Sequence, residues 1–141
     1  MKVIVKQAGK PAEITEVDFK YRNEVGKLIS DDKITNEYVH IKVNELAMVV
    51  DEDGLAKQLP LNFFLETTNP YYPVQAIVGT VVFCRYQYEN PFEKEIWDYE
   101  LRDVDEDDVA AVNKILDGAT QMKLRKEYAS CLLYTSDAAD E

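Results

Sequence analysis

Histidine, cysteine and glycine are scarce in this chain, and each shortage removes a class of active site. The chain of 141 residues contains one histidine, two cysteines and five glycines. The single histidine, His40, excludes a multi-histidine metal site, and its outward position on a predicted strand argues against a Ser–His or Cys–His pair. Gly79 stands alone in its segment, so the sequence has no glycine-rich phosphate-binding loop. We therefore expect no enzymatic activity, no catalytic residues, no cofactor and no metal site.

Positive charge is also in short supply. The chain has 16 Lys and Arg residues against 27 Asp and Glu residues, which gives a formal net charge of -11 at pH 7. Direct nucleic-acid binding is not expected, because no excess of Lys and Arg is available to displace counterions from phosphates. A basic protein partner fits this charge better.

Long apolar runs are missing as well. No run approaches the roughly 18 apolar residues that cross a bilayer, and Lys6 interrupts the N-terminal segment after three apolar residues. We expect no membrane contact and a cytoplasmic location.

The remaining composition is typical of one globular domain. Hydrophobic residues make up 46% of the chain and charged residues 30%, and a chain of this length buries about two thirds of its unfolded surface. We predict a single acidic α+β domain over residues 1–130. Its expected fold is a mainly antiparallel sheet, with one helix after an N-terminal hairpin and one or two C-terminal helices.

The middle of the chain, residues 43–63, organises this prediction. An apolar strand over residues 46–50 is followed by the turn residues Asp53 and Gly54, and Pro60 then favours a sharp corner. Around this stretch, alternation of apolar and polar residues predicts strands, and a period of 3.6 predicts helices. Strands are expected at 2–7, 12–17, 38–43, 74–89 and 95–101, and helices at 18–29, 103–116 and 119–129, with Trp97 facing the core.

Five acidic residues precede the first C-terminal helix, and they are the first candidate binding residues. They are Asp103, Asp105, Glu106, Asp107 and Asp108. Alternate carboxylates resemble the start of a calcium loop, but such a loop needs Gly at its sixth position and Glu at its twelfth, where this chain has Asp108 and Lys114. Two interpretations stay open. The acids cap the helix and interact with its dipole, or they form a surface that meets a basic partner.

Tyrosines supply the second candidate surface. Tyr71 and Tyr72 lie between two prolines in a predicted loop, where they either pack against the sheet or are presented to a partner, since tyrosine is enriched at interfaces. Cys84 lies in the most apolar run, so a small buried side chain is expected there and not a nucleophile.

The last eleven residues, 131–141, resemble a translated sequencing adapter of the kind that ends conceptual proteins from metagenomic assemblies. We exclude this segment from the predicted domain as a non-native tail, and the natural C-terminus is then expected to be missing near residue 130. Without the tail, Cys84 is the single cysteine, and no disulfide can form within one chain.

Several short motifs in order resemble an uncharacterised small-domain family carried by phages and plasmids of gut bacteria. They are Met1–Val5, Gly9–Pro11, Val25–Gly26, Leu59–Asn62 and Ile77–Val82, so the resemblance covers roughly residues 1–83. A small acidic protein of this origin is similar in character to type II-A anti-CRISPR proteins from metagenomes. This resemblance implies an inhibitor that binds a type II CRISPR effector nuclease, because such a nuclease holds its nucleic acids in a strongly positive channel.

Alternatives from other classes stay open. The chain can instead be a sponge that sequesters a nucleotide signal of host defence, for which Arg85 or Lys42 would line a pocket, or an uncharacterised protein-interaction module. A homodimer is compatible with each of these functions.

Overall fold

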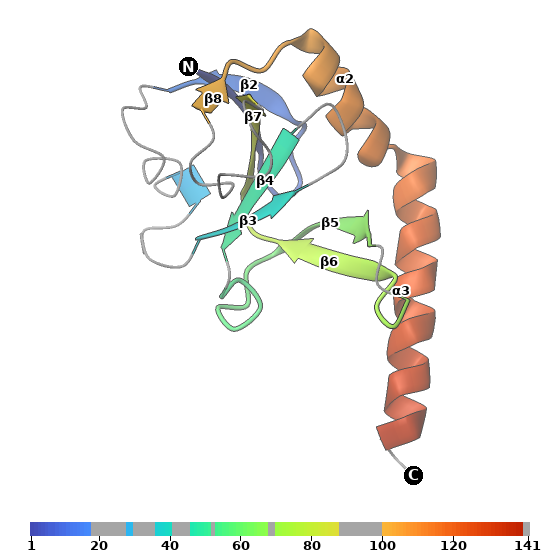
Figure 1. The fold of residues 1–141 in the computed structure, drawn as a ribbon. Helices are drawn as coiled ribbons and strands as arrows, with labels where there is room; N and C mark the ends of the chain where they lie inside the picture. Colours follow the sequence, from blue (N-terminus) through green and yellow to red (C-terminus); the bar gives the residue numbers. More distant parts are fainter. Residues whose placement is uncertain are drawn as a thin grey trace.

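The fold combines two antiparallel sheets with two C-terminal helices. The structure is a computed structural model that describes residues 1–17, 28–29, 36–40, 46–51, 53–67, 70–87 and 100–139. Figure 1 shows the larger sheet at one side of the molecule and a long helix, α3, running past a small hairpin at the other side. The predicted α+β class and the two C-terminal helices are confirmed.

Within the described residues the larger sheet has six strands, and strand β7 runs through its middle. The strand order is β2-β1-β7-β4-β3, and β8 also pairs with β7. The strands are β1 (Lys2–Lys6), β2 (Glu13–Glu16), β3 (Asn36–His40), β4 (Leu46–Asp51), β7 (Val81–Gln87) and β8 (Glu100–Arg102). All of these pairs are antiparallel, and the predicted N-terminal hairpin is confirmed as β1 and β2.

A second, two-stranded sheet corrects one prediction. The sequence predicts a single long strand over residues 74–89, whereas the structure has β6 (Val74–Val78) and β7 as separate strands. β6 pairs with β5 (Leu61–Glu66), a strand that the sequence analysis did not predict. The chain changes sheet at Gly79, whose φ of 76° lies in the left-handed region that glycine enters most readily. An uninterrupted apolar pattern therefore concealed a break at one residue.

Apolar side chains cover both faces of the larger sheet. On one face, Ile4, Met48 and Phe83 pack with Phe63 and Ile77 of the small sheet, and Val104 and Val112 join them. On the other face lie Val3, Val49, Val82 and Cys84, with Val5, Val17 and Ile29 partly buried beside them. Burial on both faces explains the nearly continuous apolar sequence of β4.

Two helices complete the described chain. Helix α2 (Glu106–Ile115) buries Val112 against the larger core, and α3 (Gly118–Ala139) places Leu124 against Phe64 and Val74 of the small sheet. α2 ends at Ile115 with Leu116 as its C-cap, and α3 begins at Gly118. No helix in the described part of the chain is long and apolar enough to cross a membrane.

Some predictions fall outside the described residues and stay predictions. The helix expected over residues 18–29 is described at Leu28 and Ile29 alone, which are helical. The strand around Trp97 is described from Glu100 onward. α3 extends to Ala139 and so crosses the predicted boundary at residue 130. The assignment of residues 131–141 to a non-native tail also stays a prediction.

Candidate functional site

Two of the five candidate acids form the N-terminal cap of α2. Asp105 is the N-cap residue, and its Oδ1 accepts the backbone N–H of Asp108 at 3.0 Å. The Oδ2 of Asp108 accepts the backbone N–H of Asp105, also at 3.0 Å. This reciprocal capping box satisfies two backbone donors that a helix start leaves without intrahelical partners. The capping interpretation of the cluster is thus correct for these two residues.

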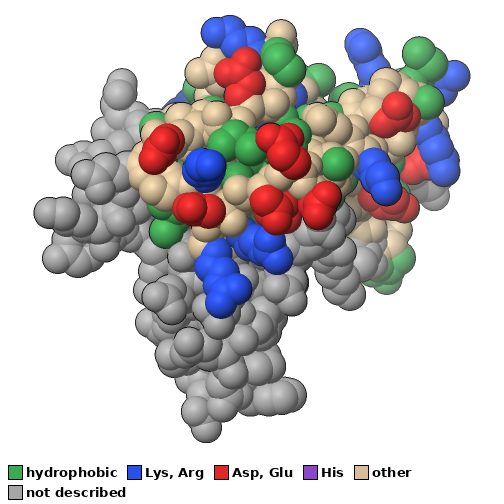
Figure 2. All heavy atoms as spheres, turned by 90° about the horizontal axis from the view of Figure 1, so that it is seen from above, with side chains coloured by type: hydrophobic (Ala, Val, Ile, Leu, Met, Phe, Trp, Pro, Cys, Tyr) green, Lys and Arg blue, Asp and Glu red, His purple; other side chains and the backbone are tan. Residues whose placement is uncertain are grey.

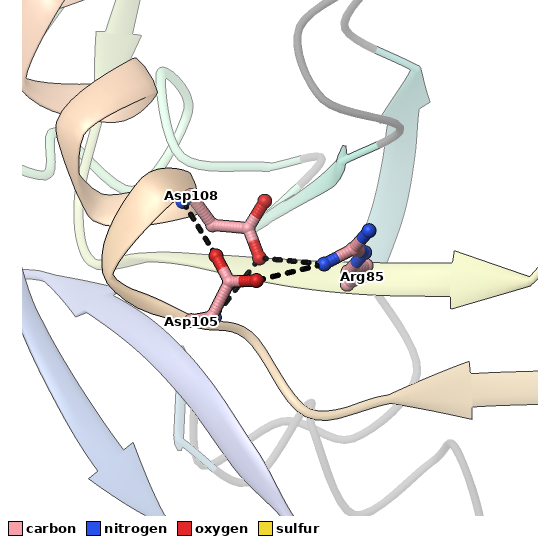
Figure 3. A network of polar contacts seen from close by, with 3 residues as sticks. All are labelled: Arg85, Asp105 and Asp108. Atoms are coloured by element: carbon pink, nitrogen blue, oxygen red, sulfur yellow. Dashed lines mark hydrogen bonds and ion pairs between the residues drawn. The ribbon is translucent and has the colours of Figure 1, made fainter.

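Arg85 of strand β7 joins the two capping residues, Asp105 and Asp108, into one network, which Figure 3 shows. Its Nη1 lies 3.0 Å from Oδ2 of Asp105 and 3.6 Å from Oδ2 of Asp108. Arg85 was expected to line a nucleotide pocket if the chain were a sponge, but its guanidinium instead ties α2 to the sheet. Lys42, the other cation named for that pocket, lies outside the described residues.

The two carboxyl groups of this network have opposite pKa shifts, which have different causes. The hydrogen bond from the Asp108 backbone, helped by the charge of Arg85, lowers the pKa of Asp105. Desolvation raises the pKa of Asp108, which is 1% exposed. Asp108 is therefore a structural carboxylate inside the fold and cannot touch a partner.

The other three acids are exposed, as Asp105 is, whereas Asp108 is buried. Asp103 accepts the backbone N–H of Lys2 at 2.8 Å, and Glu106 and Asp107 occupy the first turn of α2. On the face of the molecule that Figure 2 shows, acidic side chains are interspersed with Lys and Arg side chains. Asp103, Glu106 and Asp107 are therefore the exposed members of the cluster that lie outside the capping box.

Tyr71 and Tyr72 are presented to solvent on the turn between β5 and β6. Their exposed fractions are 83% and 72%. The base of the turn is closed by the backbone N–H of Thr67, which donates to the carbonyl of Pro73 at 2.9 Å, and the Thr67 hydroxyl donates to the carbonyl of Tyr72. Packing of these tyrosines against the sheet, the alternative that the sequence left open, is therefore wrong.

The two candidate surfaces lie apart. The acids lie where α2 begins, next to β8, whereas the tyrosine turn lies beside the middle of α3 (Figure 1). The sequence analysis proposed both groups as partner-binding residues, and the fold gives no single surface that contains them all.

The described residues offer little else for chemistry. They contain no group of three or more His, Cys, Asp or Glu side chains that could hold a metal ion. Cys84 is 1% exposed, and burial raises the pKa of its thiol to about 12, so it is not a nucleophile at neutral pH. This confirms the expected buried role of Cys84.

Sequence analysis missed a buried polar group at the junction of the two sheets. The Nζ of Lys6 donates to the Asn62 side chain and to the Gln7 carbonyl, each at 2.8 Å, and Asn62 Nδ2 donates to the carbonyls of Lys6 and Gly79. Burial lowers the pKa of Lys6. Every described partner in this group is internal, so it joins the sheets and offers no open site.

Comparison with known proteins identifies a family but no activity. No curated protein and no solved structure matches the chain. Residues 1–96 match a family model described as a domain of unknown function, DUF3846. The match spans β1 to β7 and includes the tyrosine turn, while α2, α3 and the acidic cluster lie beyond it. Because the matched region is more than half of the chain, this protein belongs to the DUF3846 family.

Proposed function

We propose that this chain is a non-enzymatic inhibitor of bacterial defence, carried by a mobile element. Its partner is a basic protein, a type II CRISPR effector nuclease, and binding blocks that nuclease from binding or cleaving DNA. The origin and the partner rest on the resemblance of the sequence to mobile-element proteins and on the net charge of -11.

One structural observation carries the protein-binding part of this proposal. Tyr71 and Tyr72 are more than two thirds exposed on a turn that is closed by two hydrogen bonds from Thr67. A tyrosine contributes a large contact area and has few side-chain torsions to immobilise, so tyrosines are frequent among the residues that dominate binding energy. A turn that is already closed loses less entropy on binding than an open loop.

The exposed acids Glu106 and Asp107 have a second role in this proposal. Charges at the edge of an interface mainly change how fast two proteins associate, and their effect falls as salt rises. We therefore assign affinity to the tyrosine turn and electrostatic steering to these two acids.

Binding to a type II effector nuclease, with and without guide RNA, tests the proposal by biolayer interferometry. Replacing Tyr71 and Tyr72 by Ala should weaken binding by at least about 30-fold, the equivalent of roughly 2 kcal/mol. The matched control is Leu55→Ala, which removes an apolar side chain that is 73% exposed on a different turn. Unchanged affinity in the double tyrosine variant refutes the assignment of affinity to this turn.

A charge variant separates steering from affinity. Glu106→Gln with Asp107→Asn should lower the association rate at low salt and leave the dissociation rate nearly unchanged. The difference from the parent should disappear at high ionic strength, because exposed charges are screened beyond about 8 Å at physiological salt. An equal loss at all salt concentrations would contradict electrostatic steering.

A further inference from the structure

The side chain of Gln121 on α3 pairs with the backbone of strand β5 as a neighbouring strand would. Its Nε2 donates to the Phe64 carbonyl at 2.9 Å, and its Oε1 accepts the Phe64 backbone N–H at 2.8 Å. In an antiparallel pair, opposite residues exchange these same two hydrogen bonds. One glutamine therefore satisfies β5 at the position where a third strand would pair with it.

Phe64 lies on the outer edge of β5. β6 pairs with the other edge, and no further strand pairs with β5 in the part of the chain that the structure describes. An unpaired strand edge is a template for another strand, and a sheet of two strands is small for independent stability. Covering this edge therefore prevents the sheet from being extended.

A small set of contacts holds α3 in place over the small sheet. Leu124 is buried with Phe64 and Val74, and the Tyr128 ring lies 5.2 Å from the Phe64 ring, measured between centroids. Gln121 Nε2 also donates to the Ile115 carbonyl at 2.8 Å and so links α3 to the end of α2. Figure 1 shows α3 passing the ends of β5 and β6 and continuing beyond them.

We infer that α3 is a removable strap over a strand-addition site, and that the strand added to the outer edge of β5 is β5 of a second copy. A two-fold axis at Phe64 lets the two Phe64 residues exchange the hydrogen bonds that Gln121 now makes. The same register places Phe63 opposite Leu65 and Asn62 opposite Glu66. Apolar residues then face apolar residues, which is favourable for cross-strand pairs. This inference does not depend on the proposed function.

Releasing the strap in the full chain tests the inference. The release variant, Gln121→Ala with Leu124→Ala, removes both the strand-like hydrogen bonds and the apolar contact. Light scattering coupled to size-exclusion chromatography should then show twice the monomer mass. Hydrogen exchange should show that the Phe64 amide stays protected in this dimer, because Phe64 of the second copy replaces Gln121 as its partner.

A proline on the same edge distinguishes strand pairing from non-specific association. The N–H of Glu66 points to the same edge as that of Phe64, because strand residues two positions apart share their orientation. Glu66→Pro removes that donor and is tolerated on an edge strand. Added to the release variant, it should restore the monomer. Dimerisation that is insensitive to Glu66→Pro, or a monomer whose Phe64 amide exchanges rapidly, overturns the inference.

A milder variant covers the case in which the release variant fails to fold. Gln121→Glu keeps the acceptor for the Phe64 N–H but loses the donors to the Phe64 and Ile115 carbonyls. It should form a larger fraction of dimer than the parent at equal concentration, and Glu66→Pro should again suppress the dimer. A folded Gln121→Glu variant that stays as monomeric as the parent overturns the inference.

Discussion

Replacing Asp108 by Ala should destabilise the protein although the residue belongs to an acidic cluster next to the surface. Asp108 is 1% exposed, and its carboxylate accepts the Asp105 backbone N–H at 3.0 Å and lies 3.6 Å from Arg85. Alanine leaves the Asp105 N–H without its acceptor and removes one of the two carboxylates beside Arg85.

The magnitude follows from these contacts. An unsatisfied buried donor costs about 1 to 3 kcal/mol, and the better helix propensity of alanine returns about half a kcal/mol. Arg85 keeps Asp105 as a partner, so the loss of one ion pair adds little. We expect a loss of about 0.5 to 2.5 kcal/mol, which lowers the melting temperature by about 3 to 5 °C for each kcal/mol in a domain of this size.

Thermal unfolding followed by circular dichroism measures this loss, with two controls. Asp108→Asn keeps an acceptor for the Asp105 N–H and removes the buried charge, so it should cost less than alanine. Asp107→Ala changes an exposed neighbour in the same helical turn and should cost less than about 0.5 kcal/mol. If Asp108→Ala and Asp107→Ala unfold at the same temperature, the capping network does not stabilise the fold as argued.

Three further predictions concern the core. Asn62→Ala should cost about 2 to 4 kcal/mol in urea unfolding, because the carbonyls of Lys6 and Gly79 and the Lys6 ammonium each lose a partner; a cost below 1 kcal/mol would show that water replaces them. Gly79→Ala should cost about 1 to 3 kcal/mol, since φ is 76° and an added Cβ would lie 2.8 Å from Leu59 Cδ1; unaltered stability would contradict the strain. Burial raises the pKa of the Cys84 thiol from 9.0 to about 12. The buried, neutral Cys84 thiol therefore makes its full contribution to the free energy of unfolding below pH 9.0, and this contribution is lost as pH rises toward about 12. In a Cys131→Ser background, a thiol reagent at pH 8 should then label Cys84 only as fast as the protein opens, and immediate labelling would refute this burial.

Much of the fold follows from local patterns in the sequence. The hairpin of β1 and β2 and the apolar stripe of α2 show the residue periods of strands and of a helix, so they could be predicted. The buried strand β4 could be predicted from its short, continuous apolar run. The break at Gly79 could not, because apolar residues on both sides of it are buried, although in two different sheets. A lone glycine inside a strand pattern was the available signal.

The candidate site was predictable in composition and not in arrangement. The sequence identifies the acids and the tyrosines, and it offers a cap as one explanation of the acids. It cannot separate Asp108 from Asp107, because their side chains differ only in the direction that the helix gives them. Arg85 contacts the cap through strand β7, twenty residues away from Asp105, and a long-range pair of this kind leaves no local pattern. Gln121 is a polar residue on a helix, and the strand edge that it covers was itself not predicted.

Inhibition of DNA cleavage tests the proposed function most directly. A type II effector nuclease loaded with guide RNA is mixed with increasing amounts of the protein, and cleavage of a matched DNA target is measured. The proposal predicts that the parent and the Leu55→Ala variant suppress cleavage as they approach the concentration of the nuclease, while the variant that carries Tyr71→Ala and Tyr72→Ala needs at least about 30-fold more protein. Cleavage that proceeds unchanged at a large excess of the parent protein, with no binding to the nuclease, would contradict it.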